Sequence, residues 1–564
     1  MTAAWRARLA LIALITVWAI ATLLWLQPGV TRPDGAGYFV YLPSTWLDHD
    51  LLFFNEWQTF GMIDHGIIRF KGITPTGHLG NHWTSGSSVL WYPAYVAGDA
   101  MRRLVPALRR YPPNGISLPY SVAVIVSSAF AGLLALLAGF TAARARYGEG
   151  AALLAATGVW LGSPLAWYSL RHSLMAHAVS AAISSLVVLL ALRLRDRADA
   201  GRLFAFGLAI GIAFAVRPQN LPLALLPLIL AETSNRWPLV RRAAYAVAGF
   251  LIGALPQIVV GYVLDGNPLG FASVGGVDPG RPWRAFERIW VWEPLLSWFH
   301  GMIPWTPFLL IAIAGFFVLL HDDRRLGLAA IYAFVAQWII NAAFERSFWG
   351  GVAFGQRRFD SCTIFFILGA AALFKRIPRW LAIAMTLVTC AWTMSLFFAA
   401  GSLDLNRYQT PSELWAAQVA AVMHPPPLAA LTFVRPDARA DVMIVGLAAL
   451  VVLGGIACLV ALALKYGGAR SVTTAAAVYL AGIAAFYAWC GSNDAARLPR
   501  YKDVIALNRD LGPVAGGAAN RLELLEEEEL YLRKSGRLAA AEDTKREIEA
   551  LQKLRDESLR RMTR

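Results

Sequence analysis

Long uncharged hydrophobic runs constrain this chain more than any other feature. The first run, residues 9–27 (LALIALITVWAIATLLWLQ), carries no charge and matches the ~20 residues that an α-helix needs to cross a bilayer. Similar runs recur along the 564 residues, of which 57% are hydrophobic and only 15% are charged. A bilayer offers no water to backbone polar groups, so such runs are expected to form helices. The sequence therefore predicts an all-α polytopic membrane protein.

Basic clusters between the runs predict how the chain threads the membrane. Arg6 and Arg8 precede the first run, so the positive-inside rule puts the N-terminus in the cytoplasm. If the later basic loops are also cytoplasmic, about 13 transmembrane helices result and the C-terminus lies outside. Residues 88–105 are then expected to lie in the outer interface; as a span, they would move every later loop to the other side. The spans expected after the first are 116–141, 150–168, 174–192, 203–216, 219–234, 243–264, 300–320, 326–343, 361–374, 380–400, 441–464 and 471–490.

Charge, cysteine placement and the first run give no indication of a nucleic-acid partner, a cysteine site or a cleaved signal peptide. The formal net charge of +15 is expected from cytoplasmic loops that face anionic lipid, so it does not indicate a nucleic-acid partner. The four cysteines lie in or beside apolar runs and show neither a disulfide framework nor metal-binding spacing. No A-x-A-like cleavage site follows the first run, which is therefore expected to stay as a span.

The chain divides into three expected parts. Residues 1–400 form the module that carries the candidate site, and its first outer loop is long, at 28–115. Residues 401–490 add an outer loop and two further spans. Residues 491–564 form a soluble tail that is dense in Glu, Lys, Arg, Leu and Ala, which predicts a solvated helix or helical hairpin with many i,i+4 charge pairs. This C-terminal helix is a candidate element for docking a protein partner or for self-association.

The first outer loop holds acids that could do chemistry. Asp34 follows the first span in the stretch 32–38 (RPDGAGY), where proline and glycine fix the backbone and leave room for a ligand. Asp48, His49 and Asp50 come later, at the end of an expected juxtamembrane helix. Three of these groups, Asp34, Asp48 and Asp50, are candidate catalytic residues, and Asp34 with Asp50 could hold a divalent cation (Mg, Mn or Ca). The alternatives are a solvated loop aspartate and helix-capping groups.

The order of these motifs resembles the GT-C superfamily of membrane glycosyltransferases. One span is followed by Pro33-Asp34-x-x-x-Tyr38, by a helix ending in Asp48-His49-Asp50, and by His82-Trp83-x-x-Gly86-x-x-x-Leu90-Trp91-x-Pro93. The superfamily includes protein O-mannosyltransferases and the aminoarabinose transferase that modifies lipid A. The resemblance covers mainly residues 1–370. Two positions depart from it: Gly35 stands where a second acid is often found, and the stretch 85–88 replaces a lysine of the aminoarabinose transferase.

The resemblance implies an activity. Such an enzyme moves a monosaccharide from a polyprenyl-phosphate donor to a lipid, glycan or protein acceptor on the extracytoplasmic face. Asp34 would be the catalytic base of an inverting reaction, and residues 86–93 would line the donor site. Apart from a divalent cation, no cofactor is implied. The expected location is a bacterial inner membrane, with the active site facing the periplasm or cell exterior.

A polyprenyl-phosphate leaving group needs cations where its negative charge develops. The candidates for that role are Arg171, His172, Arg217, Arg357 and Arg358. Two assignments have a purely structural alternative: residues 357–360 (RRFD) could pair with one another, and His177, a substrate-lining candidate, could be a packed helix residue. The candidate substrate-lining residues are aromatic or polar and lie in the same outer segments: Tyr38, His49, Trp83, Trp91, His177, Trp292, Glu293 and His300.

Two other functions remain as alternatives. A polytopic transporter or lipid-linked-sugar flippase would place charges near the bilayer midplane and would often show repeats, whereas here the charges fall at the outer surface and no repeat is visible. An O-antigen-ligase-like enzyme would carry its key features in one large late loop, whereas here the acids come first.

Overall fold

The computed structural model describes residues 3–30, 34–60, 74–231, 239–269, 289–344, 348–400 without 352, 403, 405, 408–423 and 436–497, together with 522–562 with several gaps. This described part is helical and contains no β-strand, which confirms the predicted all-α class. Eight helices are long and apolar enough to cross a membrane. They are α1 (Ala3–Trp25), α7 (Leu118–Tyr147), α10 (His177–Asp196), α13 (Leu239–Asp265), α17 (Arg324–Ile339), α19 (Arg379–Ala399), α21 (Arg439–Tyr466) and α22 (Gly468–Arg497).

Shorter helices account for the other expected spans. Each of the 12 spans expected after the first overlaps either one of the long helices or one of the shorter ones, while the number 13 itself stays a prediction. The last long helix, α22, extends to Arg497, beyond the start of the expected tail. The shorter apolar helices are α8 (Glu149–Leu161), α11 (Ala200–Val216), η3 (Pro218–Leu225) with α12 (Leu226–Leu230), α16 (Phe308–Asp322) and α18 (Thr363–Arg376).

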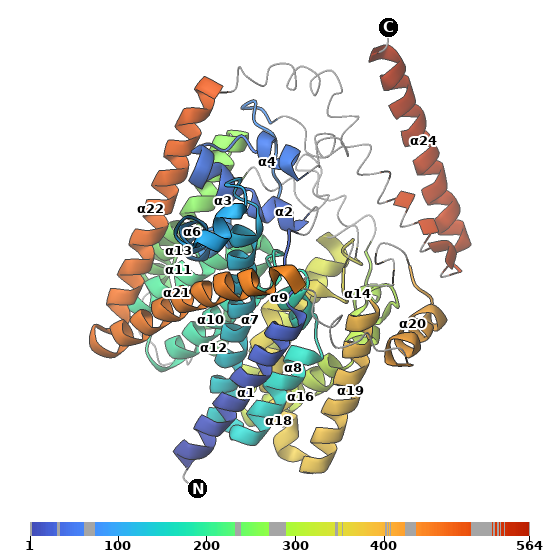
Figure 1. Ribbon diagram of the computed structural model, residues 1–564. Coiled ribbons are helices and arrows are strands. Elements are labelled where there is room, and N and C mark those ends of the chain that lie inside the picture. Colours follow the sequence, from blue (N-terminus) through green and yellow to red (C-terminus); the bar gives the residue numbers. More distant parts are fainter. Residues whose placement is uncertain are drawn as a thin grey trace.

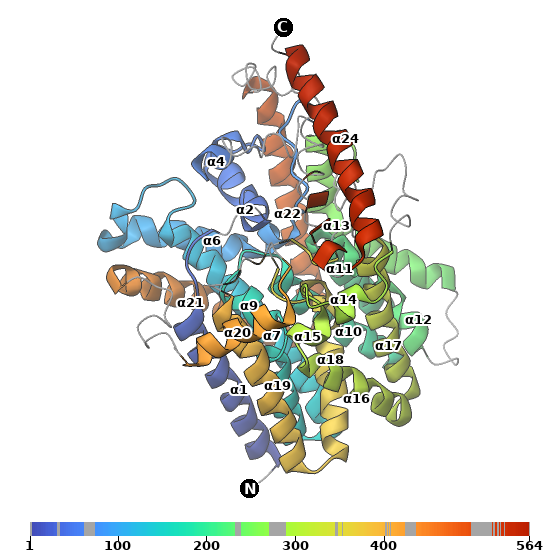
Figure 2. The same cartoon turned by 90° about the vertical axis from the view of Figure 1, so that its right-hand side faces the viewer.

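The stretch 88–105 forms α6 (Gly86–Leu104), which is not among the helices apolar enough to span. It crosses the direction of α1 steeply, as Figures 1 and 2 show. Its buried Asp99 accepts a hydrogen bond from the Tyr120 hydroxyl of α7 (2.8 Å) and pairs with Arg103 one turn later (2.6 Å). These polar contacts anchor one face of α6, while its other face packs against the bundle. Such an arrangement favours the position in the outer membrane interface that the sequence predicts for this helix.

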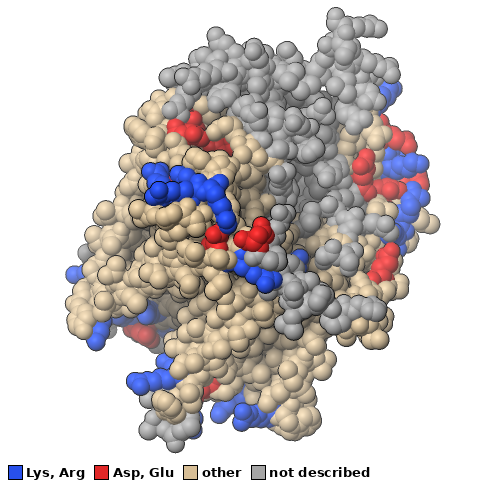
Figure 3. Space-filling view, in the orientation of Figure 1, with Lys and Arg blue, Asp and Glu red and all other residues tan. Residues whose placement is uncertain are grey.

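The two ends of the chain lie at opposite ends of the molecule. The N-terminus of α1 is at the bottom of Figures 1 and 2, and α24 (Leu538–Met562) reaches the top in both views. The first-loop helices α2 (Asp34–Phe39) and α4 (Phe54–Thr59) lie toward the same end as α24. Lys and Arg side chains border the N-terminal end of the face shown in Figure 3. A cytoplasmic N-terminus and an outer C-terminus require this separation.

Helices α11 and α13 pack closely because two glycine pairs face each other. Gly207 and Gly211 lie on α11, and Gly249 and Gly253 lie on α13, each pair at the four-residue spacing of a GxxxG motif. A Cβ added at Gly211 would lie 2.2 Å from the backbone oxygen of Phe250. The missing side chains therefore set the distance between the helices, and this contact fixes the end of α11.

This close contact predicts that one methyl group added to α11 strongly destabilises the protein. Gly211→Ala should destabilise the protein by about 1–3 kcal/mol, because the new Cβ meets backbone that cannot move without separating the helices. The readout is the apparent unfolding temperature of the detergent-purified protein. Gly454→Ala is the matched control, since a Cβ at that position of α21 would meet nothing within 4 Å. Equal unfolding temperatures for the two variants would contradict the packing.

Candidate functional site

The turn that bears Asp34 is held from behind by the segment 81–88. Asp34 is the first residue of α2, and the Asn81 side-chain amide donates to the carbonyl of Gly37 in that helix (3.0 Å). The Trp83 indole lies so close to Gly37 that an added Cβ would come within 1.9 Å of the ring. Trp83 is thus a packing residue that fixes α2, and Gly37 is required for that close approach.

The same segment also holds the turn that bears Arg217. Arg217 follows Val216, the last residue of α11. The Thr84 hydroxyl donates to the carbonyl of Val216 (2.8 Å), and Gly86 packs against this backbone with no room for a side chain. Two turns that are far apart in the sequence are therefore held by one segment, in a fixed relation to each other.

Asp34 pairs with Arg357, which comes from the start of η7 (Arg357–Cys362). The Nη2 atom of Arg357 donates to the Asp34 carboxylate at 3.0 Å and to the carbonyl of Gly350 at 2.7 Å. Burial alone would lower the pKa of Arg357, but the Asp34 carboxylate together with Tyr168 and Tyr38 raises the pKa above its usual value. The side chain of Asp34 is 31% exposed against 10% for Arg357. The carboxylate is therefore reachable from outside, and the cation lies behind it.

Tyr38 and His172 complete the surroundings of this ion pair. Burial raises the pKa of the Tyr38 phenol, and both Asp34 and Arg357 lie within its electrostatic range. Burial lowers the pKa of His172 to about 4, helped by the charges of Arg171 and Arg357. At neutral pH His172 is thus uncharged, and it can offer a hydrogen bond to an anion but not a positive charge.

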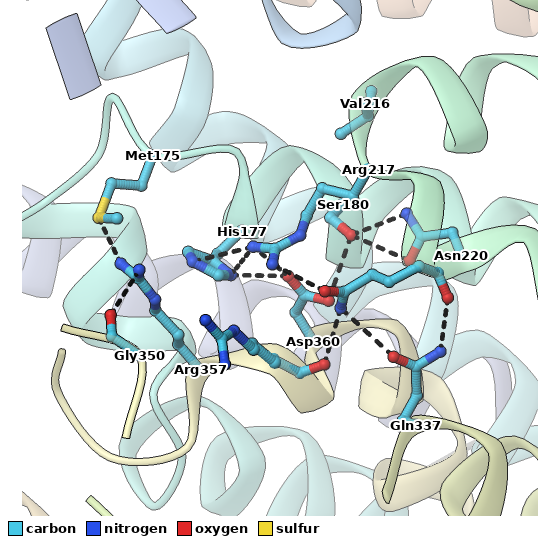
Figure 4. A network of polar contacts seen from close by, with 12 residues as sticks. Met175, His177, Ser180, Val216, Arg217, Asn220, Gln337, Gly350, Arg357 and Asp360 are labelled. Carbon is cyan, nitrogen blue, oxygen red and sulfur yellow. Dashed lines mark hydrogen bonds and ion pairs between the residues drawn. The ribbon is translucent and has the colours of Figure 1, made fainter. Parts of the chain in front are cut away.

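A second buried network lies beside the ion pair (Figure 4). The Nδ1 atom of His177 is 2.8 Å from the Asp360 carboxylate, and Nη1 of Arg217 lies against the same ring, 2.6 Å from Nδ1 and 3.0 Å from Nε2. The Ser180 hydroxyl also donates to Asp360 (3.2 Å), and Arg217 lies 3.6 Å from its carboxylate. Burial raises the pKa of Asp360 to about 6, while the charge of Arg217 acts in the opposite direction.

Amide side chains extend this network between the apolar helices. The Gln337 side-chain amide donates to the backbone carbonyl of Gln219 (2.8 Å). The Gln219 side-chain amide in turn donates to the backbone carbonyl of Arg358 (2.8 Å). Asn220 donates to the Ser180 hydroxyl (3.0 Å). The sequence analysis missed these residues, although Gln337 interrupts an apolar run. A polar residue at such a place is a signal that could have identified it.

Two residues of the cluster 357–360 have partners outside it. Arg357 contacts Asp34, whereas Asp360 contacts His177 and Arg217. Arg358 is buried in the same segment. Arg357 and Asp360 therefore connect this segment to two different elements of the bundle.

Arg171 lies at the edge of the cluster. Its Nε atom donates to the Gln27 side chain (2.9 Å), and its guanidinium lies 5.0 Å from the ring centre of Trp167. Burial lowers the pKa of Arg171 to about 10, so the group keeps its charge at neutral pH. Arg171 thus connects the end of α1 to the segment that carries His172.

The other acids of the first outer loop have different partners. Asn55 donates to the Asp48 carboxylate (2.7 Å), and the Ser44 hydroxyl donates to the carboxylate of Asp50 (2.9 Å). His49 is exposed, and its ring packs against α22. These contacts join the first outer loop to itself and to α22. The catalytic roles expected for Asp48 and Asp50 stay predictions.

The cation expected at Asp34 and Asp50 also stays a prediction. Within the ranges that the structure describes, no three His, Cys, Asp or Glu side chains gather in a way that could hold a metal ion. Asp34 contacts Arg357, and Asp50 contacts Ser44 and the backbone of Leu52. The geometry therefore adds no argument for the cation.

The remaining candidates occupy three different environments. Trp91 is fully buried in the core of the bundle. Trp292 is 59% exposed, with its ring 5.4 Å from that of Trp338, and Glu293 pairs with the tail. His300 is buried and donates to the carbonyl of Leu405 (2.8 Å), within electrostatic range of Arg357.

A narrow cavity lies between η7, α9 (Leu165–Leu170) and the helices behind them. Arg357, Asp360, His177 and Tyr168 contribute its polar wall, and its volume is about 20 Å³. That space accepts a water molecule but is too small for a sugar.

Comparison with known proteins gives little beyond this geometry. No model of a known protein family matches the chain, and no curated protein matches it. The crystal structure of ArnT from Cupriavidus metallidurans bound to undecaprenyl phosphate is similar, with 16% identity, coverage of 89% of this chain and 80% of that one, and a TM-score of 0.41. The apo structure of the same ArnT gives 17% identity, 86% and 75% coverage, and a TM-score of 0.39. At these scores neither similarity carries an argument about function.

The buried network predicts that removing a buried carboxylate destabilises the protein more than removing a surface carboxylate does. Asp360→Ala should destabilise the protein by about 3–5 kcal/mol, because it leaves the buried Arg217 without its carboxylate. Asp322→Ala is the control, since its partner Arg376 is half exposed and such surface pairs are worth about 0–1 kcal/mol. Apparent unfolding temperatures in detergent measure both. Similar losses for the two variants would show that the His177–Asp360–Arg217 network does not stabilise the fold.

Proposed function

We propose that this protein is a membrane glycosyltransferase of the GT-C type. It moves a monosaccharide from a polyprenyl-phosphate donor to a lipid, glycan or protein acceptor at the outer end of the bundle. The observation that carries the proposal is the contact between Asp34 and Arg357. These residues are 323 positions apart in the chain, and they bring a reachable carboxylate and a buried guanidinium to one place.

The charges around this contact suit an anionic donor. Among the described side chains of the cluster, three guanidinium groups accompany two carboxylates: Arg217, Arg357 and Arg358 with Asp34 and Asp360. The Nε atom of Arg357 is buried and has no hydrogen-bond partner among the described residues. A phosphate that accepted a hydrogen bond from this guanidinium would satisfy a donor that is costly to leave unpaired.

The proposed reaction uses one displacement. The acceptor hydroxyl donates its hydrogen bond to the Asp34 carboxylate and attacks the anomeric carbon of the donor sugar. The bond between that carbon and the phosphate oxygen breaks, the hydroxyl proton passes to Asp34, and the phosphate leaves with its charge held by Arg357. Attack from the side opposite the leaving phosphate inverts the anomeric configuration.

The first test is transfer by the purified protein in nanodiscs. Radiolabelled polyprenyl-phosphate sugars are incubated with membrane-extract acceptors. Wild type should transfer sugar, whereas Asp34→Asn should retain donor binding and lose transfer, because an amide cannot accept the proton. Asp196→Asn, at an exposed carboxylate on α10, is the control that should transfer like wild type. If neither wild type nor Asp34→Asn binds donor, the glycosyltransferase proposal fails and a transporter or flippase takes its place.

Arg357→Lys tests the leaving-group side of the site. A lysine has no planar fork with which to bridge Asp34, the Gly350 carbonyl and a phosphate at once, so transfer should fall by about 10²–10³-fold although the charge is kept. The measurement is the initial rate as a function of donor concentration. A lysine variant as fast as the wild type would show that Arg357 does not stabilise the leaving group.

A further inference from the structure

The charged C-terminal tail packs on itself. Its described residues between 522 and 534 run beside α24, and Leu522 and Leu525 form an apolar cluster with Ile548 and Leu551. The helical tail predicted from composition is therefore present, and it folds back along its own length (Figure 2). Leu532, Arg537 and Ala541, between these two packed parts, then meet the rest of the protein.

An ion pair joins the tail to the outer end of the bundle. Arg537 lies 2.7 Å from the Glu293 carboxylate, and Glu293 is the first residue of α14 (Glu293–Leu296). The Glu293 side chain is 11% exposed, so this carboxylate is largely covered in the contact. Lys534 adds a long hydrogen bond to the carbonyl of Tyr408 (3.4 Å).

Apolar contacts continue the same interface. Leu532 and Ala541 of the tail are buried in one cluster with the aromatic residues Trp290, Phe299, Phe348 and Trp349. Within it, the rings of Phe299 and Trp349 stack with centres 5.3 Å apart. Since the cluster takes residues from the tail, from 290–299 and from 348–349, the tail completes the packing of both loop segments.

One of these loop segments leads directly to the ion pair of the site. Trp349 precedes Gly350, whose carbonyl accepts a hydrogen bond from Arg357 (2.7 Å). Gln356, the neighbour of Arg357, donates to the carbonyl of Phe348 (2.7 Å). Gly350 has φ of +79°, a left-handed conformation that most residues avoid, so the shape of this turn depends on the glycine and on its surroundings.

We propose that the tail is a positioning element for Arg357. Docked through Arg537 and Leu532, it holds the turn at Trp349–Gly350, and that turn holds the guanidinium that meets the donor phosphate. The tail thus acts as an intramolecular partner of the site, where the sequence suggested docking or self-association. The inference rests on the proposed function, because the ligand of Arg357 is taken to be a polyprenyl phosphate.

The test measures docking and ligand binding separately. Arg537→Glu and Leu532→Ala weaken the tail contact in two independent ways, and Glu293→Lys combined with Arg537→Glu restores the ion pair with reversed charges. Docking is read from the rate of trypsin cleavage after Lys545 and Arg546, which none of these variants alters. Ligand binding is read from the Kd of undecaprenyl phosphate in nanodiscs, with Arg357→Ala as the control for its loss.

The two single variants should be cleaved faster and should bind undecaprenyl phosphate about tenfold more weakly, whereas the charge-reversed double variant should approach wild type in both. If the tail is released and the Kd stays at the wild-type value, the tail does not position Arg357. If release tightens binding, the tail is a lid and the inference is wrong. A wild type that does not bind undecaprenyl phosphate removes the proposed function, and this inference with it.

Discussion

A guanidinium buried among apolar helices has to find a partner, and this requirement organises the outer end of the protein. Arg357 meets Asp34 and Arg217 meets Asp360, so each cation brings a carboxylate from another segment to the site. Removing a charge from water is costly unless another charge or several hydrogen bonds compensate it. Because Arg357 also retains an unpartnered buried Nε atom, the compensation within the described residues is incomplete. An anionic ligand would complete it.

The scaffold behind these pairs depends on close backbone contacts. Glycines let α13 approach α11, and another glycine lets Trp83 approach the turn of Asp34. Hydrogen bonds from the segment 81–88 then connect the two turns that bear Asp34 and Arg217. The Asp34 carboxylate at the start of α2 gains a fixed position from such support, since a helix of six residues has little stability of its own.

The aromatic outer loops contact both the candidate site and the C-terminal tail. On one side they carry Gly350, which holds Arg357, and on the other side they pack against Leu532 and Ala541 of the tail. Glu293, which the sequence suggested as a substrate-lining residue, pairs with Arg537 of the tail. Aromatic residues and acids near a candidate sugar site therefore have to be assigned from their contacts, because the same residue types line ligand sites and intramolecular interfaces.

The sequence predicted the class of fold and the candidate charged residues, but it did not predict which distant residues pair. The apolar runs determined the all-α membrane class, and charge placement identified Asp34, Arg217 and Arg357 as candidates, because hydrophobicity and charge belong to each residue wherever it packs. Only the tertiary structure decided that Arg357 meets Asp34 and that Asp48 and Asp50 hold their own loop. It also decided that Trp83 supports the backbone of α2. Those outcomes depend on how helices far apart in the chain pack together, and that packing follows from the shapes of all the facing surfaces at once.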